Sequence, residues 1–578
     1  MALPSRDQLV AASRLWRSPL LLPLAVFLVS LASALRTALR WTDGRLIYAV
    51  DDTYIHMAVS KTLANHGIWG CTAFHFSSSS SSLLWTFGLG VAYRVFQVHD
   101  ATPLVLNLAL AIATLAVANI SLARVGAPPL LRASALLGIV VAFPMAGMVL
   151  LGMEHILHLL LTIAFAGMAV EGLTSPAESP RQARLRTVAL CGLGALLGAS
   201  RYEGFFLIGL VCLAFLVRRQ PLRGISIGVA ALLPLAAFGA ISLANGSYFL
   251  PNPLMVKAVG ESTSTVSALL KPFGDEDVAF LQNNRAMPIL LVLGVLGALA
   301  HWRSRRDIWR APVLFPLLLA AMILLHGHFV FSPLYWVYRY DAYLVAFGVF
   351  VAAVVVAQLP GPGALPRGAL AALAVVSLVP IIADVREGLV ADTEIEGMRN
   401  TYLEEVQTAE FIRLYYPDAA VIVNDLGAVT YYTEARILDL VGLGDIEPVV
   451  IMRRGAYTSS DVTAWTAPYR PSIAIIQLNW SVVRPLIPPE WVRVAVVEVP
   501  PHHHPVGFFA VNREEAWPLR ARVAQHFGSL GQTLGYRVRL RRPEGMAAPV
   551  PLPTAVGQEE PPRVGPGADA ADGSQPGR

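Results

Sequence analysis

Two adjacent acidic residues, Asp51 and Asp52, follow the first long apolar segment of the chain. A carboxylate needs water, a cation or a hydrogen-bond donor, because burying it without a partner costs much free energy. If the apolar segment crosses a membrane, the pair lies at the membrane surface on the far side. A base held there could serve an acceptor that arrives in water while another substrate arrives in lipid. The pair is therefore the first candidate for a catalytic site.

The segments that must position this pair are strongly apolar. The chain has 578 residues, of which 55% are hydrophobic and only 14% charged, and its mean hydropathy is +0.56. A soluble domain carries about a quarter charged residues. Apolar runs of about 14–22 residues recur up to residue 385, close to the length that crosses about 30 Å of hydrocarbon. The composition indicates an integral membrane protein, and the small net charge of +5 argues against nucleic-acid binding.

The apolar runs predict about eleven membrane crossings. We expect them near 19–35, 104–122, 130–151, 155–171, 187–200, 204–217, 224–244, 287–300, 311–327, 341–358 and 368–384. The first is interpreted as an uncleaved span, with a cleaved signal peptide as the alternative. Arginines in the loops around 124–132, 181–186, 218–223 and 303–310 place those loops in the cytoplasm. If the short segment 83–96 also crossed, successive loops would no longer alternate between the two sides of the membrane. We therefore expect this segment to dip into the membrane or lie on it.

Polar side chains gather at the span ends on the opposite side. Besides the acidic pair, this side has Ser77–Ser82, Glu154, Arg201, Glu203, Lys257, Arg339 and Tyr340. The serines could form a flexible linker, which composition favours, or a tightly turned loop near polar substrate groups. Glu154 and Arg201 could merely pair and join two helices. The one-sided distribution of the whole set nevertheless indicates a substrate site.

Beyond residue 385 the composition changes, because glutamates appear and the apolar runs shorten to strand length. We expect a helix over 402–415, strands over 419–424, 437–440, 472–478, 492–499 and 507–511, and a helix over 514–527. This predicts a polytopic α-helical membrane domain over 1–385, an extracytoplasmic α/β domain over 386–545 and a disordered tail over 546–578. The run His502–His504 could bind a metal, but its flanking prolines favour an exposed loop.

Several motifs together resemble the first outer loop and later loops of the GT-C membrane glycosyltransferases. More narrowly, they resemble the bacterial branch that includes terminal arabinofuranosyltransferases. The motifs are Asp51–His56, Gly67–Gly70, Ser80–Trp85, Gly152–Glu154, Arg201–Gly204, Pro251–Pro253 with Lys257, Arg339–Tyr340, Asn424–Ala428 and Asp439–Leu443. The chain departs from that pattern at Ala58, Leu83 and Tyr202, while both acidic residues are retained.

The resemblance implies a glycosyltransferase of the bacterial inner membrane. Its donor would be a hexose or pentose carried on a polyprenyl phosphate, and its acceptor an extracytoplasmic glycan or glycolipid. Asp51 is then expected to be the base, and Asp52 to orient the acceptor or hold a cation. Substrate-binding residues would be Glu154, Arg201, Glu203, Lys257, Arg339, Tyr340, Trp85 and Ser82.

In this interpretation the cations Lys257, Arg201 and Arg339 bind the donor phosphate. No cofactor follows with certainty from these residues, and Mg²⁺, Mn²⁺ or Ca²⁺ between Asp51, Asp52 and Glu154 is an open alternative. A transporter or flippase of lipid-linked sugars and a non-catalytic membrane scaffold are the competing functions.

Overall fold

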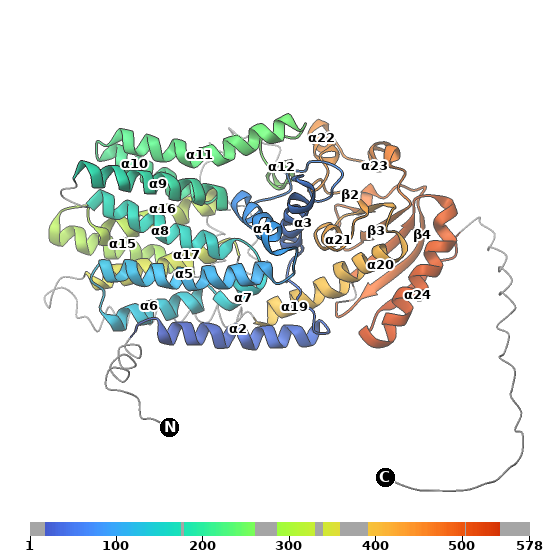
Figure 1. Ribbon diagram of the computed structural model, residues 1–578, viewed down its shortest axis with the longest axis horizontal. Coiled ribbons are helices and arrows are strands. Elements are labelled where there is room, and N and C mark those ends of the chain that lie inside the picture. The colour runs from blue at the N-terminus through green and yellow to red at the C-terminus, as the bar shows by residue number, and fades with distance from the viewer. Residues whose placement is uncertain are drawn as a thin grey trace, which may run out of the picture.

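The computed structural model describes residues 18–174, 179–259, 286–329, 339–358, 391–502 and 504–543. A bundle of apolar helices makes up one half of the molecule (Figure 1). Its helices are α2 (Leu21–Trp41), α5 (Thr102–Arg124), α6 (Pro129–Ala142), α7 (Met145–Leu151), α8 (His155–Thr174), α9 (Pro180–Ser200), α10 (Gly204–Val217), α11 (Pro221–Ala244), α15 (Ala286–Arg305), α16 (Ala311–Phe329) and α17 (Ala342–Ala357).

The predicted spans between residues 19 and 358 all coincide with helices of this bundle. Within the described residues, five helices are long and apolar enough to cross a membrane, or six if α6 and α7, bent by 45°, form one span. The predicted crossing over 368–384 and the tail over 546–578 lie outside the described residues. The protein is thus a multi-pass membrane protein, while the predicted number of eleven crossings remains a prediction.

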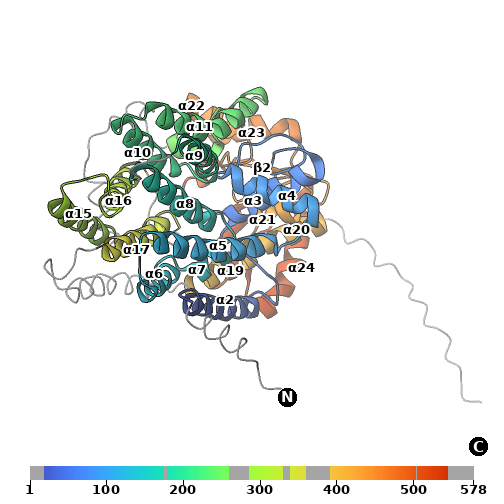
Figure 2. The same cartoon turned by 60° about the vertical axis from the view of Figure 1, so that its left-hand side comes forward.

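The bundle has two distinct ends. The arginine-rich turns between α5 and α6 and between α10 and α11 lie away from the C-terminal sheet (Figures 1 and 2). At the other end, α3 (Asp51–His66), α4 (Leu83–Phe96), α12 (Asn252–Val259) and α19 (Ala391–Thr401) lie between the bundle and the sheet. The segment expected not to cross, 83–96, is α4, which packs against α3.

The C-terminal part, which we call the sheet domain (residues 402–543), has the α/β character predicted. Its elements are η1 (Tyr402–Val406), α20 (Gln407–Tyr415), β1 (Ala420–Val423), α21 (Gly427–Tyr432), β2 (Arg436–Asp439), α22 (Glu447–Arg454), α23 (Ser459–Thr466), β3 (Ile473–Gln477), β4 (Val492–Val499), β5 (His504–Ala510), α24 (Ala516–Leu534) and β6 (Arg537–Leu540). The strand order is β2-β1-β3-β5-β4-β6. The first three strands are parallel, with Ile422 opposite Leu438 and Ala474, and the others are antiparallel.

The core of the sheet domain continues into α3. On one face of the sheet, buried strand residues such as Val421 and Ile475 share a hydrophobic cluster with Phe411 and Phe527. The same cluster includes Tyr54, Met57 and Ala58 of α3. Helix α3 is therefore a structural part of both halves of the molecule. Any residue at its first turn is positioned by the bundle and the sheet domain together.

Candidate functional site

Asp51 and Asp52 form the first turn of α3, immediately after Val50 in extended conformation. Acidic side chains at this end are favoured by the positive end of the helix dipole. The helix ends at Gly67, whose positive φ of 72° lets its amide donate to the Leu63 carbonyl. The sequence pattern therefore fixes where α3 begins and ends, and it places the acidic pair at the boundary between the two halves.

The Asp51 carboxylate contacts the sheet domain. The Gly427 amide donates to its Oδ2 atom at 2.5 Å, and the Ala428 amide donates to Oδ1 at 2.7 Å. Asp51 is also hydrogen bonded to the side chain of Asp425. Burial raises the pKa of Asp51, and these hydrogen bonds lower it again only in part. Asp51 is thus an oriented carboxylate with more than ordinary proton affinity.

Asp52 points to the other side, toward the later loops of the bundle. One of its oxygens lies 2.8 Å from a guanidinium nitrogen of Arg339, and the Asp52 side chain is 44% exposed. The Arg339 guanidinium lies over the Tyr340 ring at 5.0 Å, and the Arg201 guanidinium lies over the same ring at 5.5 Å. The structure thus brings Asp52, Arg339, Tyr340 and Arg201 together.

Arg201 connects this group to two buried carboxylates. It donates to Glu154 at 2.7 Å and to Glu203 at 2.7 and 3.2 Å. The second oxygen of Glu154 lies 3.6 Å from Nε2 of His56 on α3. Glu154 and Arg201 do form the ion pair that the simpler interpretation expected. The pair is part of a larger polar cluster, because Glu154 also contacts His56 of α3.

The serine run is a tightly turned, mostly buried loop, so the interpretation as a flexible linker is wrong. Ser80 bonds both His56 and Thr86, at 3.3 and 2.7 Å, and Ser81 contacts His56 at 3.5 Å. Ser82 begins α4 by accepting a hydrogen bond from the Trp85 amide at 3.4 Å. Ser82 and Trp85 thus lie at the start of the helix that carries Thr86, which contacts His56 at 2.7 Å. Sequence composition could not reveal this loop because His56 supplies the partner for its serines.

Lys257 lies on α12, and its side chain is outside the described part of the structure. Helix α12 itself begins beside the serine loop, because the Asn252 amide donates to the Ser78 carbonyl at 2.9 Å. The Asn252 side chain donates to the Leu443 carbonyl of the sheet domain at 3.2 Å. The backbone around Lys257 is therefore held near the serine loop and the sheet domain.

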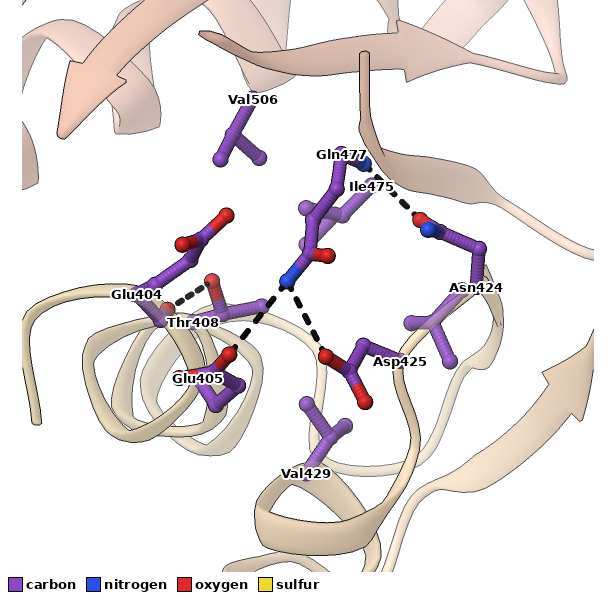
Figure 3. A pocket seen from close by; sticks show the side chains of 10 residues that line it. Glu404, Glu405, Thr408, Asn424, Asp425, Val429, Ile475, Gln477 and Val506 are labelled. Carbon is purple, nitrogen blue, oxygen red and sulfur yellow. Dashed lines mark hydrogen bonds between the residues drawn. The ribbon is translucent and has the colours of Figure 1, made fainter. Parts of the chain in front are cut away.

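A second acidic group, which the sequence did not reveal as a site, lies behind Asp51 in the sheet domain. Asp425 precedes α21, and Glu404 and Glu405 lie on η1. Figure 3 shows these carboxylates around one small cavity with Asn424 and Gln477. Burial raises the pKa of Asp425 and that of Glu405 well above their ordinary values, and neighbouring carboxylates raise both further. The one available signal was the Asp-x-Gly-Ala motif over 425–428.

A cation shared by Asp51, Asp52 and Glu154 gains no support from this geometry. Each of the three carboxylates is held by a different partner: backbone amides, Arg339 and Arg201, respectively. Among the residues that the structure describes, no group of three or more His, Cys, Asp or Glu side chains is arranged to hold a metal ion. His502 instead contacts Glu396 at 2.6 Å, and His504 begins β5.

Comparisons with known proteins agree with this fold. Residues 393–518 match a family described as a domain of unknown function (DUF8728). No curated protein matches the sequence. Among solved structures, the chain is similar to ArnT from Cupriavidus metallidurans in the apo state, with a TM-score of 0.52 and 13% identity over 86% of this chain and 98% of that chain.

Two further structures resemble the chain more weakly. ArnT from the same organism bound to undecaprenyl phosphate has a TM-score of 0.49 and 14% identity over 85% of this chain and 97% of that one. The archaeal oligosaccharyltransferase AglB from Archaeoglobus fulgidus, in complex with an inhibitory peptide and a dolichol-phosphate, has a TM-score of 0.45 and 11% identity over 85% and 74%. The likeness to apo ArnT confirms the GT-C-like fold that the sequence motifs indicated.

Proposed function

We propose that the protein transfers a sugar from a polyprenyl-phosphate donor to a glycan or glycolipid on the outer side of a bacterial inner membrane. The observation that carries this proposal is the convergence of Asp51, Asp52, Arg339, Arg201 and Glu154 where the apolar bundle meets the sheet domain. At such a boundary a lipid-linked donor can approach from the bilayer while a polar acceptor approaches from water. The ArnT-like fold supports the same activity.

In this proposal Asp51 is the base. A general base is most effective when its pKa lies near the working pH and when a further group fixes its orientation. Burial raises the pKa of Asp51, and the Gly427 and Ala428 amides fix its carboxylate. As the acceptor oxygen attacks the anomeric carbon, its proton passes to Asp51 and the bond to the phosphate oxygen breaks. A single displacement of this kind inverts the sugar centre.

The donor phosphate is assigned to the two stacked arginines. Arg339 and Arg201 both lie over the Tyr340 ring, so their planar guanidinium groups are held close together. A guanidinium can donate two parallel hydrogen bonds to phosphate oxygens, which a point charge cannot. Asp52 orients Arg339 until the phosphate arrives, and Glu154 and Glu203 orient Arg201. Lys257 of α12 is a third candidate for the phosphate.

The proposed arrangement in the membrane follows from the charges at the two ends of the bundle. The arginine-rich turns would face the cytoplasm, and the acidic pair and sheet domain would lie outside. Residues 1–385 would then form the catalytic membrane domain and 386–545 the extracytoplasmic domain. A flippase or a scaffold would have no need for a base and a phosphate clamp at one boundary.

The test is sugar transfer by the purified full-length protein with a panel of polyprenyl-phosphate hexoses and pentoses. Asp51→Asn is expected to lower kcat by about 100-fold or more, the usual contribution of a general base. Asp418→Asn, on an exposed residue of the sheet domain, is the matched control. Transfer by Asp51→Asn at the wild-type rate would refute the assignment of the base. Movement of intact lipid-linked sugar across vesicles, without transfer, would instead establish the flippase alternative.

A further inference from the structure

The cavity behind Asp51 is lined by more carboxyl groups than the transfer reaction uses. Its polar lining consists of Glu404, Glu405, Thr408, Asn424, Asp425 and Gln477 (Figure 3). Three buried polar atoms at this lining have no hydrogen-bond partner within the described residues: Oε1 of Glu404, Oε2 of Glu405 and Nδ2 of Asn424. Glu404 as a whole residue is 7% exposed and Asn424 is 2% exposed. Such atoms are normally satisfied, so the cavity requires an occupant.

The size of the cavity limits what this occupant can be. Its volume is about 20 Å³. A cavity needs roughly 10–15 Å³ to hold one water molecule, so a sugar is excluded and a water molecule fits. The described carboxylates are not arranged as a set of metal ligands. Water that receives protons from buried carboxylic acids is the occupant that agrees with both observations.

A continuous chain of contacts links this cavity to the proposed base. Asp51 is hydrogen bonded to Asp425. The amide nitrogen of Gln477 donates to Asp425 at 3.3 Å and reaches Glu405 at 3.5 Å (Figure 3). Asp425 thus lies between the base on one side and Glu405, Gln477 and the cavity on the other. Two carboxyl oxygens within hydrogen-bond distance of each other must share a proton, since two negative charges repel at that distance.

We propose that Asp425 is the positioning residue of Asp51 and that the cavity behind it is the route by which the proton of the acceptor leaves the site. This inference rests on the proposed glycosyl transfer. In that reaction the acceptor O–H bond and the bond from the anomeric carbon to phosphate oxygen break, and one new glycosidic bond forms. The leaving phosphate keeps the electron pair, and one proton is released. Asp51 accepts this proton, Asp425 passes it on, and water in the cavity receives it.

Other titratable groups lie around the contacts that link Asp51, Asp425 and Glu405, and they will contribute to any measurement made as a function of pH. Asp52 and Arg339 lie on the substrate side. On the cavity side, His504 of β5 lies 3.5 Å from Glu404, and Tyr536 donates to the backbone carbonyl before Glu404, that of Leu403. Burial is the first cause of the raised pKa values of Asp425 and Glu405, so both carboxyl groups hold protons at a pH where exposed ones do not.

The first arm of the test needs no substrate. Infrared spectra of the full-length protein in detergent are recorded from about pH 5 to about pH 9, across the range where ordinary carboxyl groups are already ionised. We expect a carbonyl band of a protonated carboxylic acid to persist near neutral pH and to weaken or shift in Asp425→Asn. Asp418→Asn is the control that leaves it unchanged. A band identical in wild type and Asp425→Asn would overturn the shared proton.

The second arm measures transfer and separates proton movement from mere hydrogen bonding. An asparagine at position 425 can still donate to Asp51, but it cannot pass on a proton. We therefore expect Asp425→Asn to lower kcat by about 10- to 100-fold with an unchanged donor KM, as for the partners that orient metal-binding side chains. Asp425→Glu should restore part of the rate, and Asp425→Ala should move the acid limb of the pH profile to higher pH. Wild-type turnover by Asp425→Asn would overturn the exit route.

The two arms also separate this inference from the proposed function. If the wild type transfers no sugar from any donor but the infrared band depends on Asp425, the glycosyl transfer fails and the shared proton stands. If transfer occurs and depends on Asp51 but not on Asp425, the proposed function stands and the exit route fails.

Discussion

Asp51 and Lys61 lie on the same helix, α3, and contact opposite ends of the short helix α21 of the sheet domain. Asp51 accepts hydrogen bonds from the first amides of α21, while Nζ of Lys61 donates to the carbonyls of Thr430, Tyr431 and Thr433 at 2.7–3.3 Å. A negative group thus meets the positive end of the helix dipole and a positive group meets its negative end. This pairing fixes the sheet domain on the helix that bears the acidic pair.

Lys61→Met tests this attachment. Methionine retains the apolar stem of the side chain and removes the charge that bonds three carbonyls and Glu434. We expect a loss of about 2 kcal/mol in the free energy of unfolding, the usual contribution of a hydrogen-bonded charge. A lower Tm and faster proteolysis between the two halves would report it. Arg413→Met, at an exposed site of α20, is the control, and a Lys61→Met protein as stable as this control would contradict the prediction.

Gly427→Ala tests the close approach of α21 to Asp51. An added Cβ atom would clash with the Asp51 carbonyl oxygen and would lie 2.5 Å from its Oδ2 atom. We expect this variant to separate the two segments, to lower Tm and to reduce kcat by about tenfold or more, because small displacements of a catalytic group are costly. Gly528→Ala on α24, where an added Cβ meets nothing within 4 Å, should leave both quantities unchanged. Normal turnover by Gly427→Ala would show that this contact is not needed.

Arg339→Ala tests whether Arg339 binds the donor phosphate. The variant loses the contact with Asp52 and the stacking on Tyr340. We expect the KM for the donor to rise by about tenfold or more, in line with the loss of a charge-assisted bidentate contact. Arg339→Lys should recover only part of the affinity, because an ammonium group cannot bond in the same forked geometry. Arg181→Ala, exposed at the start of α9, is the control. An unchanged donor KM would remove Arg339 from the phosphate site.

Glu394 provides a prediction about pH that is independent of catalysis. It lies on α19, the residue is 1% exposed, and neither carboxyl oxygen has a partner within the described residues. Burial raises the pKa of Glu394 to about 8. Because the ordinary value is about 4.3, the folded protein binds a proton that the unfolded chain lacks between these two values. As the pH rises across this window, the titration of Glu394 should therefore lower the free energy of unfolding of the protein by about 1.4 kcal/mol per pH unit.

The variant Glu394→Met removes this titration. We expect its Tm to exceed that of the wild type near neutral pH, and the difference to grow as the pH approaches the pKa of Glu394. Thermal unfolding of both proteins at several pH values measures it. Glu514→Met, at an exposed site of the sheet domain, controls for the added methionine. Parallel curves for the wild type and Glu394→Met would show that Glu394 is not buried as described.

Local sequence patterns predicted the elements well where periodicity alone decides them. The strand over 492–499 has the predicted bounds, because five of its eight residues are valines, which favour extended structure. The strand expected over 507–511 instead begins at His504, since pairing with β4 extends it through Pro505. No local pattern indicates the strand β6, because the short segment 537–540 is mostly exposed and acquires its structure by pairing with the edge of β4.

The candidate site was predictable in its members but not in its connections. The acidic pair, Arg339 and Tyr340 could be identified because polar residues are rare at the ends of apolar spans. The contacts of Asp51 with Gly427 and Asp425 join segments that lie far apart in the sequence, so no local pattern could indicate them. For the same reason no local pattern indicates the contacts of Lys61 with the carbonyl end of α21.

The dependence of Asp51 on Gly427 has a consequence during biosynthesis. The proposed base emerges from the ribosome with the first span, but the amides that orient it are made only after most of the chain has been translated. A chain that stops before α21, or whose spans insert in the wrong order, would carry every arginine and acidic residue of the bundle and still lack a formed catalytic centre. Reactivity toward lipid-linked substrates would thus be withheld from nascent and misassembled protein.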